Sequence, residues 1–267
     1  MQNFFKNKLS SLNDSKLARF YTGLTLGGIV AIIIILNIPF LSWLILGVCF
    51  LLAFSEAVRL FAIPTRLHLY ITAIIIWLVS YFYAKPLYVA ILAVTILASY
   101  NAFYQKSKNK DYLPLLYPTF PFLCFWTIYK DFGGTAIVWL IIIVALGDIC
   151  AYFGGRAFGK SPLSPVSPKK TIEGAIIGVI VASLIGTIIG VSVSFNDIKI
   201  GFITSFFIAF LVVLISIFGD LFESMLKRSA NVKDSGNVLP GHGGVLDRID
   251  GILFGAVAML FLLEWVK

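Results

Sequence analysis

The residues best suited to chemistry lie between Phe218 and Asp250, in a chain otherwise dominated by long apolar runs. Two acidic pairs, Asp220 with Glu223 and Asp247 with Asp250, have the i, i+3 spacing that places two side chains on one helix face. If the two helix ends meet, their carboxylates repel one another and need a cation to hold them together. Hard oxygen ligands without cysteine suit Mg²⁺. The sequence therefore predicts a divalent metal site in this stretch.

Asp148 is a further candidate carboxylate. It lies about five residues inside one end of a predicted membrane span, where an unpaired charge costs up to about 2.5–3.5 kcal/mol at mid-bilayer. Such a side chain needs compensation, and a shared metal ion would provide it. The alternative for all of these carboxylates is a set of salt bridges to lysine and arginine at the membrane interface.

Between the two acidic pairs lies a glycine-rich loop, LPGHGGVLDR, from Leu239 to Arg248. Its glycines let the backbone approach a ligand closely, and successive N–H groups in such a turn form an anion-binding nest, with His242 as a further donor. Four nearby basic residues exceed what membrane topology needs: Lys227, Arg228, Lys233 and Arg248. Together, these features indicate the transfer or displacement of a phosphoryl or nucleotidyl group.

A second polar segment runs from Asp148 to Gly174. Its residues 154–161 satisfy the letters of a P-loop, G-x-x-x-x-G-K-S, but a predicted membrane span precedes them and prolines follow, so the strand and helix of a P-loop are missing. Its glycines and basic residues can still form an anion-binding loop at the membrane surface. Alternatively, the basic residues are only a topological anchor. They are Arg156, Lys160, Lys169 and Lys170.

Glu56 and Arg59 stand three residues apart near the end of the second predicted span. This spacing places them on one helix face, where they can pair. We expect a structural ion pair here rather than a catalytic role.

The composition is that of an integral membrane protein. Of the 267 residues, 59% are hydrophobic and only 13% are charged, against about a quarter charged in soluble domains. The net charge is +8, but the basic residues are spread over the ends of apolar segments, which argues against a nucleic-acid partner. Three cysteines lie singly within apolar runs, so no disulfide framework or zinc site is expected.

Breaking the chain at its charges, prolines and polar clusters predicts an all-α, multi-pass protein with about nine transmembrane helices. The expected spans are residues 20–37, 40–62, 68–83, 86–103, 112–128, 134–153, 172–194, 201–226 and 251–266. We further expect a basic membrane-surface head (1–19), an N-terminal transmembrane scaffold (20–128) and a C-terminal catalytic region (129–267).

The distribution of positive charge predicts the orientation. With nine spans, 17 of the 21 Lys and Arg residues fall on one side and 4 on the other. Positive residues near span ends are retained in the cytoplasm, so the N-terminus and the stretch from Phe218 to Asp250 are expected on the cytoplasmic side.

The residues of the two polar segments resemble those of a known family. The signature of phosphatidate cytidylyltransferases, also called CDP-diacylglycerol synthases, is matched by Ser224-x-Leu226-Lys227-Arg228-x4-Lys233-Asp234-x-Gly236-x2-Leu239-Pro240-x-His242-Gly243-Gly244-Val245-x-Asp247-Arg248-Ile249-Asp250. Ser167-Pro168-Lys169-Lys170-Thr171-x-Glu173-Gly174 is similar to the family's other polar region. This polar region begins at Asp148. Ile149 and Cys150 depart from the family's pattern there, because a small polar residue usually follows the aspartate.

The resemblance implies that CTP and phosphatidate react to give CDP-diacylglycerol and pyrophosphate. It also implies a Mg²⁺-dependent homodimer in the bacterial inner membrane, with one or two metal ions and the active site facing the cytoplasm. Asp220 and Asp247 would then bind metal directly, with Asp148, Glu223 and Asp250 as ligands or supports. The expected catalytic residues are Lys227, Arg228, Lys233, Asp234, His242 and Arg248. The expected substrate-binding residues are Arg156, Lys169, Lys170, Ser224, Gly243 and Gly244.

Two other classes of protein remain as alternatives. One is a different CTP-dependent lipid enzyme, such as a polyprenol kinase or a CDP-archaeol-type synthase. The other is a transporter, although transporters place binding groups near the bilayer midplane and the acidic residues here map to helix ends.

Overall fold

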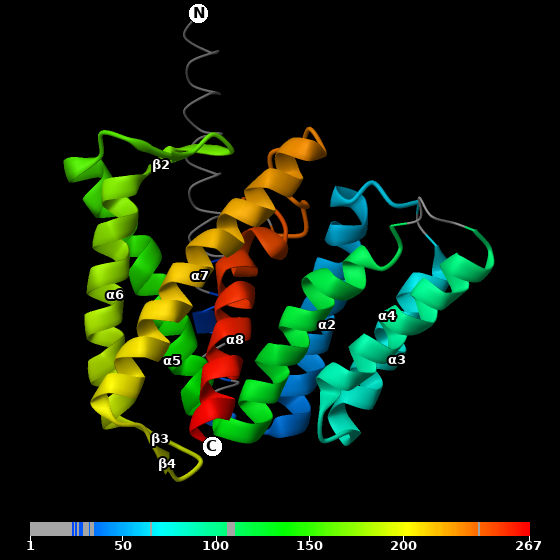
Figure 1. The fold of residues 1–267 in the computed structure, drawn as a ribbon, viewed down its shortest axis with the longest axis horizontal. Coiled ribbons are helices and arrows are strands. Elements are labelled where there is room, and N and C mark those ends of the chain that lie inside the picture. Colours follow the sequence, from blue (N-terminus) through cyan, green and yellow to red (C-terminus); the bar gives the residue numbers. More distant parts are fainter. Residues whose placement is uncertain are drawn as a thin grey trace, which may run out of the picture.

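The computed structural model describes residues 23, 25, 27, 28, 32, 35–64, 66–105, 110–239 and 241–267. The fold is all-α, as predicted (Figure 1). Its helices are α2 (Pro39–Leu60), α3 (Leu67–Phe82), α4 (Pro86–Phe103), the short π-helix η1 (Leu115–Thr119), α5 (Phe120–Phe158), α6 (Ile172–Ser192), α7 (Phe202–Ser229) and α8 (Leu246–Val266). Two antiparallel hairpins join them, β1 (Pro162–Ser164) with β2 (Ser167–Thr171), and β3 (Ser194–Phe195) with β4 (Ile198–Lys199).

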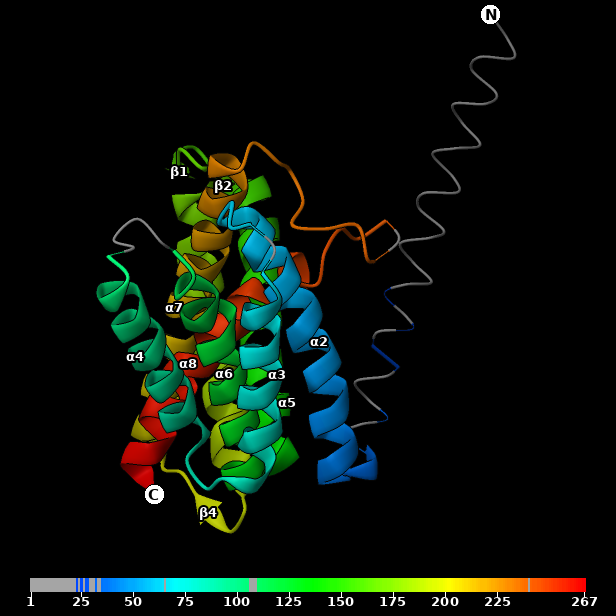
Figure 2. The same ribbon diagram turned by 90° about the vertical axis from the view of Figure 1, so that its right-hand side faces the viewer.

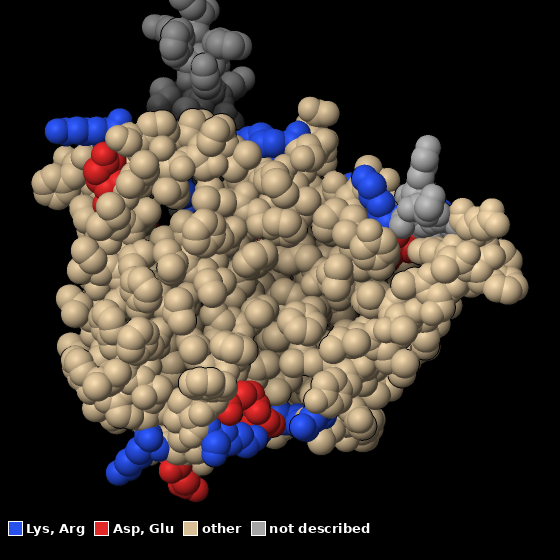
Figure 3. Space-filling model, in the orientation of Figure 1, with Lys and Arg blue, Asp and Glu red and all other residues tan. Residues whose placement is uncertain are grey.

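The helices have the length and composition of membrane spans. Six candidate spans occur among the described residues, and the apolar α3 is shorter, at 16 residues. In Figure 3, Lys, Arg, Asp and Glu gather at two opposite ends of the molecule, and a broad uncharged band lies between them. The predicted head and most of the first predicted span lie outside the described residues. The count of nine spans and the cytoplasmic N-terminus therefore stay predictions.

Helix α5 contains two of the predicted spans, separated by a break at Gly133. The backbone there has φ 83°, a left-handed conformation that favours glycine. The chain reverses at this point, so that α5 descends and then rises again in Figure 1. Near the turn, the C-terminal Lys267 pairs with Asp131 at 3.1 Å. The two halves correspond to the expected spans 112–128 and 134–153.

One face of α6 consists of small residues spaced four apart. All are buried: Gly174, Gly178, Ala182, Gly186 and Gly190. The approach to α5 is so close that a Cβ added to Gly178 would lie 2.5 Å from the carbonyl oxygen of Gly147. Small residues at this spacing let membrane helices pack backbone to backbone. This repeat fixes α6 against its neighbours and so fixes the hairpin that precedes it.

The helices form two groups side by side in Figure 1, with α6, α7, α8 and the second half of α5 in one group and α2, α3 and α4 in the other. Trp126 of α5 holds the second group to the first half of α5 by donating to the carbonyl of Ser80 at 3.0 Å. Within the second group, Trp43 of α2 stacks on Trp77 of α3. Figure 2 shows the segment between α7 and α8 extending beside the upper end of α2.

Candidate active site

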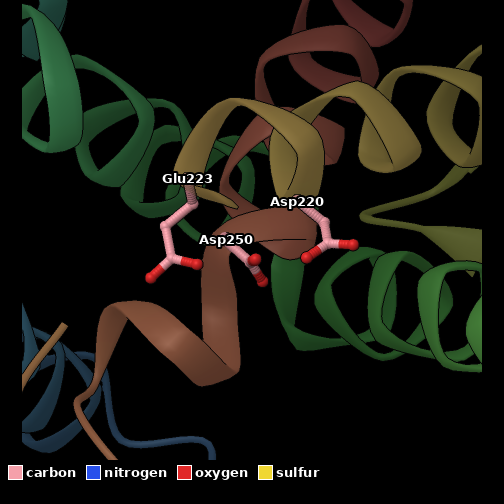
Figure 4. Close-up of side chains that lie close together, drawn as sticks. All are labelled: Asp220, Glu223 and Asp250. Atoms are coloured by element: carbon pink, nitrogen blue, oxygen red, sulfur yellow. The ribbon is translucent and has the colours of Figure 1, made fainter. Parts of the chain in front are cut away.

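Three carboxylates from two helices meet near one end of the bundle. Asp220 and Glu223 lie on α7, Asp250 lies on α8, and one oxygen of each lies within 4.8 Å of the others. Figure 4 shows the three groups side by side, with Asp250 between the other two. The expected convergence of these two helix ends is therefore observed.

Lys227 joins this cluster to Asp247. Its Nζ pairs with Glu223, four residues earlier on α7, and lies 2.7 Å from Asp247 Oδ1. The other Asp247 oxygen, Oδ2, accepts from the backbone N–H groups of Ser235 and Gly244, each at 2.8 Å, and lies 3.0 Å from the Ser235 hydroxyl oxygen. Both oxygens of Asp247 are thus engaged by protein donors.

Beside the carboxylates lies a cavity of about 480 Å³. The β1–β2 hairpin covers one side of it, and Lys170 of β2 pairs with Asp220. Eight of the predicted site residues line the cavity together: Asp148, Arg156, Lys169, Lys170, Asp220, Asp247, Arg248 and Asp250. Residues from α5, β2, α7 and α8 therefore face one space that carries both signs of charge.

An apolar groove of about 380 Å³ lies next to this cavity. It runs between α6 and α7, and its lining is entirely apolar, with Val179, Ile180 and Leu214 among its walls. Leu163, Ala175 and Ile217 line both spaces, so the polar cavity continues into the groove. Ile180 is 53% exposed, which places the groove on the outer surface of the bundle.

The other predicted site residues lie outside the cavity lining formed by the described chain. Two of them contact residues that line the cavity: Glu223 lies next to Asp250, and Lys227 pairs with Asp247. The remaining seven are Ser224 and Arg228 on α7 and Lys233, Asp234, His242, Gly243 and Gly244 on the loop.

The glycine turn contacts Asp247 within the protein, because the Gly244 N–H donates to that carboxylate. The expected binding of phosphate by this turn stays a prediction. Gly243 has φ 84°, and a Cβ there would lie 2.6 Å from Asp247 Oδ2. His242 enters the site through its carbonyl, which accepts from Arg248 Nε at 2.9 Å. The turn therefore supports cavity-lining side chains.

The predicted ion pair between Glu56 and Arg59 is wrong. Glu56 is fully buried, and no ion pair among the described residues joins it to Arg59. Instead, Glu56 accepts from the backbone N–H groups of Val245 and Leu246, each at 2.9 Å, and from the Ser235 hydroxyl at 2.8 Å. The first N–H groups of a helix have no partner within the helix, and the helix dipole favours a negative charge there, so the start of α8 stabilises this buried carboxylate. The contacts span 179 to 190 residues, which local spacing cannot reveal.

Comparison with known proteins decides the family. The cytidylyltransferase family profile matches residues 17–266. This chain belongs to the cytidylyltransferase family. The phosphatidate cytidylyltransferase of Helicobacter pylori strain ATCC 700392 / 26695 is 41% identical over 250 residues, covering 92% of each chain. That of Thermotoga maritima is 42% identical over 149 residues, 54% of each chain, and that of Bacillus subtilis is 33% identical over 183 residues, 66% of this chain and 67% of its own. The resemblance inferred from the signature is confirmed.

The carboxylate cluster of this cytidylyltransferase family member fits the Mg²⁺ ion that the resemblance implies. Glu223 is fully buried, and its Oε1 has no hydrogen-bond partner among the described residues, whereas Lys227 pairs with its Oε2 and Lys170 pairs with Asp220 Oδ2. Buried carboxylate oxygens are hard ligands that need positive charge, which is what Mg²⁺ supplies. Asp220, Glu223 and Asp250 lie close enough to share one cation, whereas both oxygens of Asp247 are held by Lys227, Ser235 and Gly244.

Proposed function

We propose that this chain transfers the cytidylyl group of CTP to phosphatidate, giving CDP-diacylglycerol and pyrophosphate. One observation carries the proposal: a cavity lined by carboxylates and basic side chains continues into a wholly apolar groove. An amphipathic substrate fits this arrangement, with its phosphate among the charges and an acyl chain in the groove. The relatives named above as phosphatidate cytidylyltransferases support the same substrates.

The residues of the cavity suit an in-line displacement at phosphorus. An oxygen of the phosphatidate phosphate bonds to the α-phosphorus of CTP while the bond from that phosphorus to the pyrophosphate oxygen breaks. The attacking oxygen is already anionic, so positioning and charge stabilisation carry most of the rate and no strong base is needed. Arg156, Lys169, Lys170 and Arg248 line the cavity and would neutralise phosphate charge.

Asp220, Glu223 and Asp250 would hold Mg²⁺, with Asp148 and Asp247 beside them. When bound, the ion would neutralise charge on the phosphates of CTP as it develops. Lys227 keeps Glu223 and Asp247 in place while this occurs. A second ion, which the resemblance also allows, belongs to the same proposal.

We also propose that the site faces the cytoplasm from the bacterial inner membrane and that the enzyme is a homodimer. The charge distribution supports this orientation, because with nine spans 17 of the 21 Lys and Arg residues would fall on the side that carries the site. CTP is a cytoplasmic nucleotide, whereas the lipid phosphate lies at the membrane surface. A site at the helix ends is within reach of both substrates.

The test is incubation of the purified protein in detergent with phosphatidate, Mg²⁺ and labelled CTP. We expect label to enter the lipid phase from α-labelled CTP and not from γ-labelled CTP. Transfer from γ-labelled CTP would instead identify a lipid kinase. Absence of lipid label from either nucleotide would contradict the proposal and favour a transporter.

A further inference from the structure

Glu56 is a buried carboxylate that the proposed reaction does not use. It lies on α2, in the N-terminal half of the chain, and has no exposed surface. Burying a carboxylate is costly unless hydrogen bonds satisfy its oxygens. Here Oε1 accepts from Val245 N–H, and Oε2 accepts from Leu246 N–H and from the Ser235 hydroxyl. Three donors from the α7–α8 loop and the first residue of α8 thus converge on this side chain.

The backbone of that loop approaches this carboxylate closely. A Cβ added to Gly236 would lie 2.6 Å from Glu56 Oε1, and one added to Gly244 would lie 2.5 Å from Oε2. Two glycines therefore leave the space that the carboxylate occupies. The loop thus packs closely against both carboxylate oxygens of Glu56.

Ser235 connects Glu56 to the active site. Its hydroxyl lies 2.8 Å from Glu56 Oε2 and 3.0 Å from Asp247 Oδ2, and its backbone N–H donates to the same Asp247 oxygen at 2.8 Å. Asp247 lines the cavity and pairs with Lys227, whereas Glu56 does not line it. Among the described residues, Ser235 therefore links Glu56 to Asp247, while Val245 and Leu246 link Glu56 to the start of α8 just before Asp247.

We propose that Glu56 is a positioning residue of the active site. It fixes Ser235 and the first turn of α8, so that Asp247 and Lys227 keep their places beside the carboxylate cluster. The inference rests on the proposed function, since it assigns to Asp247 and Lys227 a part in that reaction. It also gives the N-terminal half, expected to be only a scaffold, a direct part in the geometry of the site.

The test compares Glu56→Gln with wild-type protein in detergent by hydrogen–deuterium exchange and by kcat. Glutamine keeps the size of the side chain, but its amide nitrogen cannot accept from the loop donors. Asp111→Asn is the matched control. Asp111 is also a buried carboxylate, 1% exposed, and it pairs with Arg66 at 2.7 Å, away from the cavity lining.

In Glu56→Gln we expect faster exchange confined to residues 235–247, and a kcat lower by roughly 10- to 100-fold, the usual effect of losing a residue that orients a site. Asp111→Asn should leave both the exchange of residues 235–247 and kcat close to wild type. Unchanged exchange in this segment, exchange that rises throughout the chain, or a kcat near wild type in Glu56→Gln would each overturn the proposal.

Ser235→Ala provides a second variant in case Glu56→Gln does not fold. It removes only the hydroxyl that contacts both carboxylates, so we expect a smaller effect of the same kind on exchange and kcat. Wild-type behaviour of Ser235→Ala would then overturn the proposal. The exchange measurement needs no substrate. It still tests the positioning role if wild-type protein transfers no label, a result that would contradict the proposed function alone.

Discussion

Lys227 of α7 pairs with Asp247 at the start of α8, with 2.7 Å between Nζ and Oδ1, and the same ammonium group pairs with Glu223. The side chain of Glu223 is fully buried and that of Asp247 is 4% exposed. One cation therefore balances two carboxylates from two helices. The contact holds α7 to α8 at the point where the carboxylate cluster forms.

Replacing Lys227 with Met should destabilise the protein strongly, because two buried carboxylates lose their cation. Breaking a buried ion pair from one side costs about 3–5 kcal/mol. Thermal unfolding in detergent should give a much lower Tm for Lys227→Met than for wild-type protein. Lys199→Met, at an exposed position in β4, should have the wild-type Tm. Adding Glu223→Gln to Lys227→Met should recover part of the loss. A Tm equal to wild type in the single variant would contradict this account.

Replacing Lys170 with Gln should lower turnover with little effect on stability. Lys170 is on a surface hairpin, and its ammonium group reaches Asp220 across the cavity. Loss of one group that stabilises transition-state charge costs about 10²- to 10³-fold in kcat. Lys160→Gln is the control, because its side chain is exposed outside the cavity lining. A steady-state assay in which both variants turn over alike would exclude a catalytic part for Lys170.

The sequence predicted those parts of the fold and site that follow from residues close together in the chain. Two i, i+3 acidic pairs at the ends of apolar runs indicated the meeting of α7 and α8, and the polar break before residue 134 indicated the reversal in α5. The four-residue repeat of small residues on α6 is just as readable, but its packing role was not inferred. Glu56 could not be placed, because its partners lie on a loop in the other half of the chain. The contact of the Gly244 N–H with Asp247, by contrast, spans only three residues and is local.

Removing divalent metal should abolish turnover, and adding Mg²⁺ should restore it. Asp220→Asn and Asp247→Asn should each abolish turnover while the protein still inserts and folds, the first by removing a ligand and the second by freeing Lys227 and Ser235. Electron paramagnetic resonance with Mn²⁺ as a probe should show binding to wild-type protein and much weaker binding to Asp220→Asn. Asp131→Asn, at the opposite end near Lys267, is the control. Equal Mn²⁺ binding in all of these proteins would place the metal elsewhere.

Gly178→Ala should destabilise the contact between α5 and α6. The new Cβ would lie 2.5 Å from the carbonyl oxygen of Gly147, and a backbone atom cannot move aside as a side chain does. Overpacking of this kind costs about 1–3 kcal/mol. Gly201→Ala is the matched control, because a Cβ there meets nothing within 4 Å. Thermal unfolding should separate the two variants, and an equal Tm would mean that the helices adjust freely.

Filling the apolar groove should change which lipids the enzyme uses. Ile180 and Ile188 are both exposed on α6, at 53% and 65%, but only Ile180 lines the groove. Ile180→Trp should obstruct an acyl chain, so kcat/KM for dioleoyl phosphatidate should fall on the order of tenfold, an effect typical of a changed apolar pocket. A dihexanoyl substrate extends less far into the groove and should be affected less. Ile188→Trp adds the same bulk to the lipid-facing surface and should leave both substrates unchanged. If Ile180→Trp has no greater effect than Ile188→Trp on kcat/KM for dioleoyl phosphatidate, the groove does not hold the acyl chain. The charged cavity would then have to receive the lipid phosphate by another path.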